Sequence, residues 1–166
     1  MPFNFQFRSL ADRKDLSNLT NFLIKQNLGY PNYEDWVQRT EHQLDLGNKT
    51  PIVAYSNGNI AGNLIYQPHK ELPRVREIKN LRIHPQVRRR HFAQFMLKQM
   101  ELDTPQNYDA IIVDARTSQT DIITMFLTAG YTPIATKALY DNHHQDTIMV
   151  KTTDSGIIYN VKNLMN

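Results

Sequence analysis

Hydrophobic and polar positions change period along the first part of the chain. Residues 4–10 alternate between apolar and polar side chains, which predicts an edge strand. Apolar side chains then recur at helical spacing over residues 12–27, and Ser9 and Asp12 have the spacing of a capping box. Asn32 is positioned to cap a second helix, whose apolar face follows directly.

The centre of the chain combines a hairpin, a strand and a helix. Apolar runs at 52–55 and 60–66 flank a Ser-Asn-Gly-Asn turn, which is typical of a β-hairpin. Residues 77–83 alternate with the period of a strand and end at a His-Pro pair. Helical spacing of apolar residues follows over 89–101, so the predicted helix begins among three arginines.

The last part of the chain continues this alternation of strands and helices. Residues 110–113 form a short apolar run that predicts a buried strand. Ser118 and Asp121 again have capping-box spacing, before a helix that Gly130 is placed to stop. Two further strands, which would form a second hairpin, are predicted at 132–140 and 147–151.

The order of these elements defines a fold class. No repeat or linker interrupts the pattern, so we expect one domain over residues 1–166, with 153–166 as a further strand or a docking tail. The predicted order is β-α-α-β-β-β-α-β-α-β-β. Strand–helix–strand units in the second half require some parallel pairing, so the class is α/β (α+β) with a mixed sheet.

Composition limits the chemistry and the cellular location that we expect for the protein. The 166 residues are 40% apolar, which is enough for a packed core, and the absence of cysteine excludes disulfides and thiolate metal sites. No segment has the length of an apolar membrane span, and the first residues do not resemble a signal peptide, so we expect a cytoplasmic protein without membrane contact. A net charge of +3 favours anionic ligands without by itself indicating nucleic acid.

The strand, turn and helix around three arginines carry the most specific chemistry. Backbone N–H groups in the first turn of a helix have no intrahelical partners, and with the helix dipole they form an anion site. Arg88, Arg89 and Arg90 lie at that position and supply charge-assisted donors for phosphate oxygens. This context favours a diphosphate site over a solvated run of charge.

This segment resembles the GNAT N-acetyltransferase superfamily. The superfamily signature is a strand followed by Arg/Gln-x-x-Gly-x-Gly/Ala at the start of a helix, and Arg88 and Ala93 match it. His91 stands at the position of the first glycine. We expect it to be tolerated, because helical dihedrals suit any L-residue and the ring can turn away or donate to a phosphate. The element order over residues 3–152 also agrees.

The resemblance implies a fold and a cofactor. The fold would be a twisted, mostly antiparallel sheet of about seven strands with about four helices, splayed at its central parallel pair. The cofactor would be acetyl-CoA, whose pantetheine arm pairs with the backbone of the strand before the arginine helix. The implied cofactor-binding residues are Leu81, Arg82, Ile83, Arg88, Arg89, Arg90, His91, Phe92, Ala93, Gln119 and Phe126.

The resemblance also implies catalytic residues. Glu77 matches a glutamate that serves as base in histone-modifying members, where it accepts the proton of an amine that attacks the thioester directly. That reaction requires no metal and no covalent enzyme intermediate. Phe126 occupies the position of the usual tyrosine acid, and Gln119 that of a frequent asparagine. Tyr131, Tyr140 or water could take the place of that acid, and release of the thiolate does not strictly need one, because a thiol is fairly acidic.

The acceptor is the least defined part of the prediction. Tyr30, Tyr33 and Trp36 are candidates for the acceptor site, although aromatic residues of this kind are more often part of a core. The partner would be a small-molecule or peptide amine, and the chain a monomer or homodimer. His143-His144 indicates a polar turn and not a metal site, because adjacent residues on a strand point in opposite directions.

Three functions remain open from the sequence. The first is transfer of an acetyl group from acetyl-CoA to a primary amine. The second is a non-catalytic acyl-CoA-binding or regulatory domain, which the departures at His91 and Phe126 keep open. The third is a nucleic-acid module, which we rank last because only one helix start is basic and no recognition motif is present.

Overall fold

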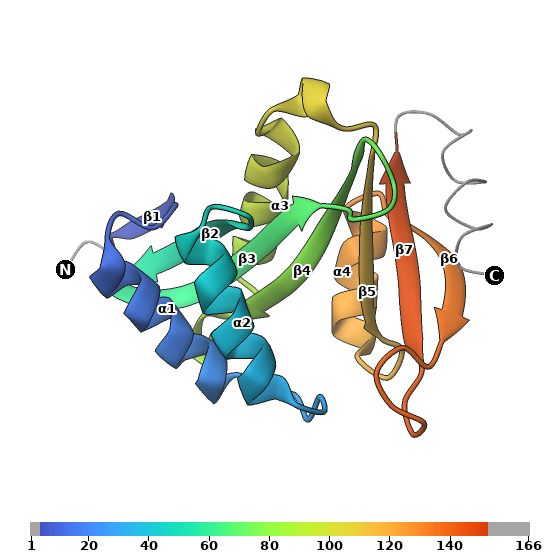
Figure 1. Cartoon of the computed structure of the whole chain (residues 1–166), viewed down its shortest axis with the longest axis horizontal. Coiled ribbons are helices and arrows are strands. Elements are labelled where there is room, and N and C mark those ends of the chain that lie inside the picture. Colours follow the sequence, from blue (N-terminus) through green and yellow to red (C-terminus); the bar gives the residue numbers. More distant parts are fainter. Residues whose placement is uncertain (1–3, 153–166) are drawn as a thin grey trace. The chain divides into compact units, whose positions relative to one another are not determined.

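The computed structural model describes residues 4–152, and its elements follow the predicted order (Figure 1). Short 3₁₀ helices at Pro85–Val87 and Pro105–Asn107 are additional. The tail at 153–166, expected as a strand or docking segment, lies outside the described residues. The strands and α-helices are β1 (Phe5–Arg8), α1 (Arg13–Lys25), α2 (Tyr33–Asp45), β2 (Thr50–Ser56), β3 (Asn59–Pro68), β4 (Val75–Ile83), α3 (Phe92–Leu102), β5 (Ala110–Arg116), α4 (Thr120–Thr128), β6 (Thr132–Lys137) and β7 (Asp146–Thr152).

Hydrogen bonding joins the strands in the order β1-β2-β3-β4-β5-β7-β6. The pairs β1–β2, β2–β3, β5–β7 and β6–β7 are antiparallel. β4 pairs with β5 in parallel, with Val75 opposite Ala110 and Glu77 opposite Ile112. The mixed sheet with a parallel pair, expected from the strand–helix–strand order, is confirmed.

The chain divides into two compact units, which are described separately. The first comprises Met1–Gln67 and Lys79–Asp103, and the second comprises Pro68–Ile78 and Thr104–Asn166. β4 contributes its first residues to the second unit and its last residues to the first. The expectation of one domain stays a prediction.

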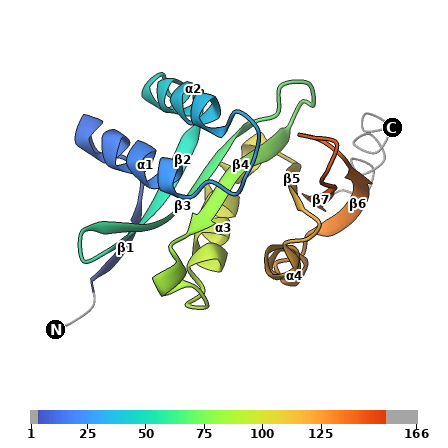
Figure 2. The same cartoon turned by 90° about the horizontal axis from the view of Figure 1, so that it is seen from below.

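In the first unit, helices cover both faces of the strands. Figure 2 shows α1 and α2 on one side of β2, β3 and β4, and α3 on the other. On the α3 side, Phe92 meets the rings of Phe5 and Phe7 edge-on, at centroid distances of 5.0 and 5.2 Å. The core on the other side contains Leu16, Leu19, Phe22, Leu23, Tyr33, Val37, Leu44, Val53, Tyr55 and Ile65.

The helix caps differ from the residues that spacing suggested. Asp12, not Ser9, caps α1, and its carboxylate accepts a hydrogen bond of 2.8 Å from the Asp15 backbone N–H. α2 begins after Asn32 and α4 after Gln119, and no side-chain hydrogen bond caps either helix. The capping role expected for Ser118 is therefore wrong, because α4 begins one residue later than that box requires.

The β2–β3 hairpin contains two features that matter for the site. Asn57 and Gly58 in its turn have φ values of 51° and 81°, which are the left-handed values that an Asn-Gly hairpin turn requires. The register then shifts, since Ala54 lies opposite Gly62 while Tyr55 lies opposite Ile60. Ala61 is therefore the extra residue of a β-bulge.

A buried amide pair links β3 to β4. Asn63 Nδ2 donates to Asn80 Oδ1 at 2.9 Å. Asn63 is 0% exposed and Asn80 is 6% exposed, so water does not compete for this bond.

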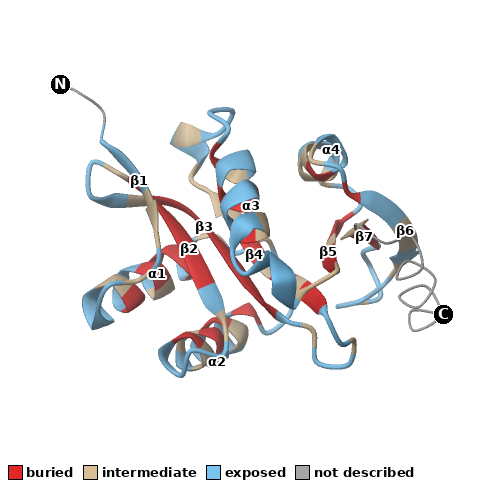
Figure 3. Cartoon of the chain, turned by 90° about the horizontal axis from the view of Figure 1, so that it is seen from above, coloured by how far each residue is buried: buried red, intermediate tan, exposed pale blue. Residues whose placement is uncertain are grey.

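The second unit contains β5, β6, β7, α4 and the start of β4. Buried residues concentrate on β5 and β7, and the red segments of β5 are visible in Figure 3. The β6–β7 connection is ordered by Asp141, whose carboxylate accepts the backbone N–H groups of His143 and His144. Its contact with the His144 ring lowers the pKa of Asp141 to about 2. The expected polar turn is confirmed.

Candidate functional site

The three arginines lie in the loop before α3. The prediction of a helix from residue 89 is wrong at its start, because α3 begins at Phe92. A 3₁₀ turn over Pro85–Val87 comes first, and Arg88 then has an extended backbone with φ −62° and ψ 158°. Arg89 has φ 61°, which is incompatible with a right-handed helix. Arg88, Arg89 and Arg90 are all exposed in this loop.

His91 has a left-handed backbone, which corrects our expectation of helical dihedrals there. Its φ is 62° and its ψ is 15°, and it is the residue immediately before α3. L-residues other than glycine adopt this conformation at a cost, because their Cβ crowds the backbone. Glycine has no Cβ and would adopt this conformation without that cost.

Replacing His91 with glycine is expected to stabilise the fold by about 0.5–1 kcal/mol. The substitution removes the cost of the left-handed conformation, and the greater entropy of glycine in the unfolded chain offsets only part of that gain. Denaturant unfolding of the two proteins measures the difference.

Arg90→Gly is the matched control for this prediction. Arg90 is the neighbouring loop residue, and its φ is not positive. We expect it to lose about 0.5–1 kcal/mol, since glycine only raises the entropy of the unfolded chain there. A loss of stability in both variants would contradict the assignment of strain to His91.

Several contacts hold the loop between β4 and α3. His84 Nδ1 accepts a hydrogen bond from the Gln86 backbone N–H at 3.2 Å, so it starts the 3₁₀ turn. Arg88 Nε donates to the Ile83 carbonyl at 3.3 Å, which anchors the guanidinium at the end of β4. This role of His84 was not anticipated, although a histidine before proline at a strand end is a recognisable turn signal.

The N-terminus of α3 is suited to an anion. The side chain of its N-cap residue, His91, does not cap the first N–H groups, and such groups have no partner within the helix. Phe92 is only 6% exposed and packs on β1, so of its groups the backbone N–H is the one suited to a ligand. Ala93 is partly exposed and adds no bulk. Together with three exposed guanidinium groups, these amides provide the donors that a diphosphate requires.

The end of β4 is tied to the loop between α1 and α2. Leu81 is buried, whereas Arg82 and Ile83 are partly exposed. Arg82 donates from Nη1 to the Leu81 carbonyl at 2.9 Å and from Nε to the Gln26 carbonyl at 3.4 Å. Within the first unit, therefore, Arg82 connects the expected cofactor strand to the loop after α1.

The aromatic acceptor candidates lie beside that loop, but they do not have equal access. Tyr33 is 5% exposed, and its hydroxyl donates to the Leu23 carbonyl at 2.7 Å. Its ring stacks on Trp36 with centroids 5.7 Å apart. Tyr33 is thus a core residue in this structure. Tyr30 and Trp36 are partly buried against the same core.

The second unit holds the remaining candidates. Glu77 is partly exposed on β4, and its register partner in β5 is Ile112. Gln119 immediately precedes α4, and its backbone N–H donates to the Arg116 carbonyl at 2.9 Å. Its side chain is partly exposed and forms no cap.

Aromatic residues at the end of α4 form a compact contact. Phe126 is 1% exposed and meets Tyr131 edge-on, with centroids 5.1 Å apart. Tyr131 is itself 3% exposed, and the Lys151 ammonium lies 5.9 Å from the centroid of its ring. Tyr140 is exposed, and its hydroxyl donates to the Asp114 carboxylate at 2.7 Å. The two tyrosines therefore differ in access, and Tyr140 has its proton committed to a carboxylate.

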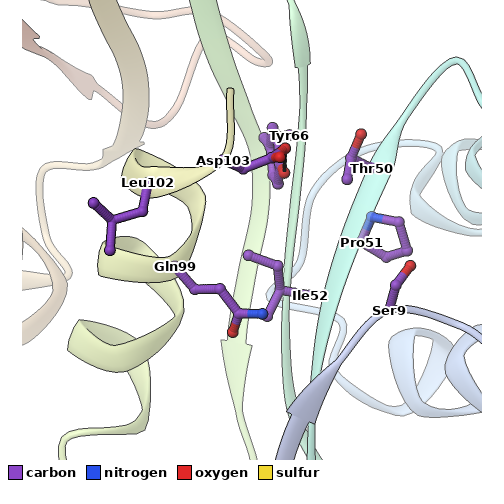
Figure 4. Close-up of a pocket in the computed structure, with 8 residues that line it drawn as sticks. All are labelled: Ser9, Thr50, Pro51, Ile52, Tyr66, Gln99, Leu102 and Asp103. Atoms are coloured by element: carbon purple, nitrogen blue, oxygen red, sulfur yellow. Dashed lines mark hydrogen bonds between the residues drawn. The ribbon is translucent and has the colours of Figure 1, made fainter. Parts of the chain in front are cut away.

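A cavity in the first unit lies away from the arginine loop. It has a volume of about 440 Å³, and Figure 4 shows Tyr66 and Asp103 in contact at one end of it. The Tyr66 hydroxyl donates to Asp103 at 2.5 Å. None of the implied cofactor residues lines this cavity. Its lining residues are Ser9, Thr50, Pro51, Ile52, Tyr66, Gln99, Leu102 and Asp103.

The described residues contain neither a metal-binding cluster nor a helix that could span a membrane. Residues 4–152 contain no group of three or more histidine or acidic side chains arranged to hold a metal ion. Within that same range, every helix is too short or too polar to cross a membrane.

The fold agrees with solved acetyltransferase structures. A GNAT-family acetyltransferase from Streptococcus pneumoniae is 14% identical over 91% of this chain and 100% of its own, with a TM-score of 0.70. An N-acetyltransferase from Staphylococcus aureus is 14% identical over 91% and 99%, with a TM-score of 0.73. Arabidopsis thaliana NAA60, solved in complex with acetyl-CoA, is 12% identical over 90% and 99%, with a TM-score of 0.73.

The chain therefore has the GNAT fold, as its arginine motif and element order predicted. At the level of sequence, no family model and no curated protein matches it.

Proposed function

We propose that the protein is an N-acetyltransferase that transfers an acetyl group from acetyl-CoA to a primary amine. The observation that carries this proposal is the loop before α3, where three exposed arginines precede uncapped helix amides. The GNAT fold supports it, because that arrangement stands where the superfamily signature begins its helix.

Different residues of the chain would hold different parts of the cofactor. The amides of Phe92 and Ala93 and the guanidinium of Arg88 would hold the diphosphate. The backbone of Leu81 and Ile83 would pair with the pantetheine arm like an added strand. The resemblance to the superfamily also implies Gln119 and Phe126 as cofactor-binding residues.

The reaction requires a base for the amine and hydrogen-bond donors for the thioester carbonyl. Most amines are protonated at neutral pH, so a base must take a proton before the nitrogen can attack. Glu77 would accept that proton, directly or through water, and backbone N–H groups would polarise the thioester carbonyl. The acetyl group then passes from sulfur to nitrogen in one displacement, without a metal or a covalent enzyme intermediate.

Protonation of the leaving thiolate does not require the usual tyrosine. Phe126 fills that position and is buried against Tyr131. A thiol is already fairly acidic, so water can complete the step. Tyr131 is the candidate acid on the chain, and it is favoured over Tyr140 because the Tyr140 proton bonds to Asp114.

A non-catalytic acyl-CoA-binding domain is the second candidate. Phe126 at the tyrosine position favours it, since it removes a group that the chemical step commonly uses. The two candidates share the cofactor site and differ only in turnover.

One experiment separates them. The full chain is titrated calorimetrically with acetyl-CoA and desulfo-CoA, and thiol release is then followed with a panel of small-molecule and peptide amines. We expect saturable binding of both ligands and thiol release that depends on one class of amine. Binding without turnover on any amine would support the second candidate, and absence of binding would refute both.

A further inference from the structure

Gly62 is a buried residue of β3, and it lies against the end of β4. Its φ is not positive, so glycine is not required there by the backbone conformation. Space is the limiting factor instead. A Cβ at residue 62 would lie 2.8 Å from the Arg82 carbonyl oxygen and 2.9 Å from Ile83 Cδ1. A glycine within a strand often marks such a close approach of another backbone.

The two contacts differ in how easily they can yield. Ile83 Cδ1 is the flexible end of a side chain, which can change rotamer. The Arg82 oxygen belongs to the backbone of β4. A methyl group at residue 62 would therefore have to move the peptide group between Arg82 and Ile83.

That peptide group connects Gly62 to the expected cofactor strand. A peptide unit is planar and trans, so the Arg82 C=O and the Ile83 N–H are held in one rigid plane and point in opposite directions. The C=O faces Gly62 of β3. The Ile83 N–H is consequently directed toward the opposite edge of β4, where a paired pantetheine arm would accept it.

The β-bulge at Ala61 also contacts the chain at the end of β4. The carbonyl of Ala61, the extra residue, accepts the His84 backbone N–H at 2.7 Å, directly after β4. β-Bulges redirect a strand locally and are common beside functional sites. Ala61 and Gly62 thus contact the last residues of β4 from the same side.

We propose that Gly62 is a positioning residue for the cofactor site: its lack of a side chain allows the Arg82–Ile83 peptide to seat against β3, which aims the Ile83 N–H at the acyl-CoA arm. This inference rests on the proposed function, because it assumes that β4 holds the arm. It adds a residue that does not touch the cofactor itself.

The test compares Gly62→Ala with Gly58→Ala in the full chain. Both variants add one methyl group to the same hairpin, but a Cβ at Gly58 meets nothing within 4 Å. Gly58→Ala also strains a left-handed residue, since the φ of Gly58 is 81°, so it controls for loss of stability. Binding is measured with acetyl-CoA and with adenosine 3′,5′-bisphosphate, which lacks the arm.

We expect Gly62→Ala to weaken acetyl-CoA binding about tenfold, which corresponds to the loss of one hydrogen bond. Its affinity for adenosine 3′,5′-bisphosphate should change less, and Gly58→Ala should bind both ligands like the native protein. The proposal is overturned if folded Gly62→Ala binds acetyl-CoA as the native chain does, or if Gly58→Ala shows the same loss. Failure of the native chain to bind acetyl-CoA would instead refute the proposed function.

A measurement on the native chain keeps the inference testable if Gly62→Ala does not fold. The amide resonance of Ile83 in ¹⁵N-labelled protein is followed during titration with acetyl-CoA and with adenosine 3′,5′-bisphosphate. We expect a large shift with acetyl-CoA alone. An Ile83 amide that responds equally to both ligands, or to neither while acetyl-CoA binds, overturns the role assigned to that peptide.

Discussion

Replacing Glu77 with glutamine is expected to lower turnover by about 100-fold or more, with acetyl-CoA affinity near that of the native protein. Glutamine keeps the size and hydrogen-bonding groups of the side chain but cannot accept a proton from the attacking amine. Steady-state thiol release gives turnover, and calorimetry gives the affinity.

The pH profile sharpens this prediction. If Glu77 is the base, raising the pH should partly restore the variant, because a larger fraction of the amine is then free of its proton. Glu71→Gln is the control, since Glu71 is an exposed carboxylate in the loop before β4. Unchanged turnover in Glu77→Gln would exclude Glu77 as the base.

Replacing Arg88 with alanine is expected to weaken acetyl-CoA binding by about 10- to 100-fold, the usual value of hydrogen bonds to a charged group. The bond from Arg88 Nε to the Ile83 carbonyl places its guanidinium at the end of β4. Calorimetric titration measures the change.

Ionic strength gives a second readout for Arg88. The native affinity should fall with added salt, and the Arg88→Ala affinity should fall less, because one exposed charge facing the diphosphate is missing. Arg13→Ala controls for total charge, since the Arg13 side chain is 90% exposed on α1. Normal binding by Arg88→Ala would show that the phosphate assignment is misplaced.

Most elements of the fold could be predicted from the sequence, because buried residues recur at helical spacing in helices such as α1, whereas strands such as β2 and β3 are continuous runs of buried residues. β4 is less regular, because Ile78 and Asn80 are buried on one face and Leu81 is buried on the other. The Asn-Gly turn of the first hairpin could also be predicted, because few other residue pairs accept two left-handed conformations.

Helix starts were harder to predict, because they depend on local dihedrals that spacing does not reveal. Asp12 and Ser9 are both good caps, and only the extended backbone of Asp12, with φ −156°, selects it. The start of α3 was placed too early because arginine has a good helix propensity, whereas Arg89 and His91 are left-handed.

The candidate site was predictable only in its charged part. Three consecutive arginines after a strand are visible in any reading of the sequence. The contribution of Gly62 was not, because it depends on the approach of a strand that lies about twenty residues further along the chain. An isolated glycine within a strand pattern was the available signal.

The Asn63–Asn80 bond has a consequence for how β3 and β4 pair during folding. Were β4 to slip along β3, the Asn63–Asn80 bond would be lost, at a cost of about 1–3 kcal/mol for each amide group left buried and unsatisfied. Folding is thereby steered to a single alignment of the two strands. That alignment is also the one that brings Arg82 and Ile83 next to Gly62, so a buried amide pair selects the geometry at the end of β4.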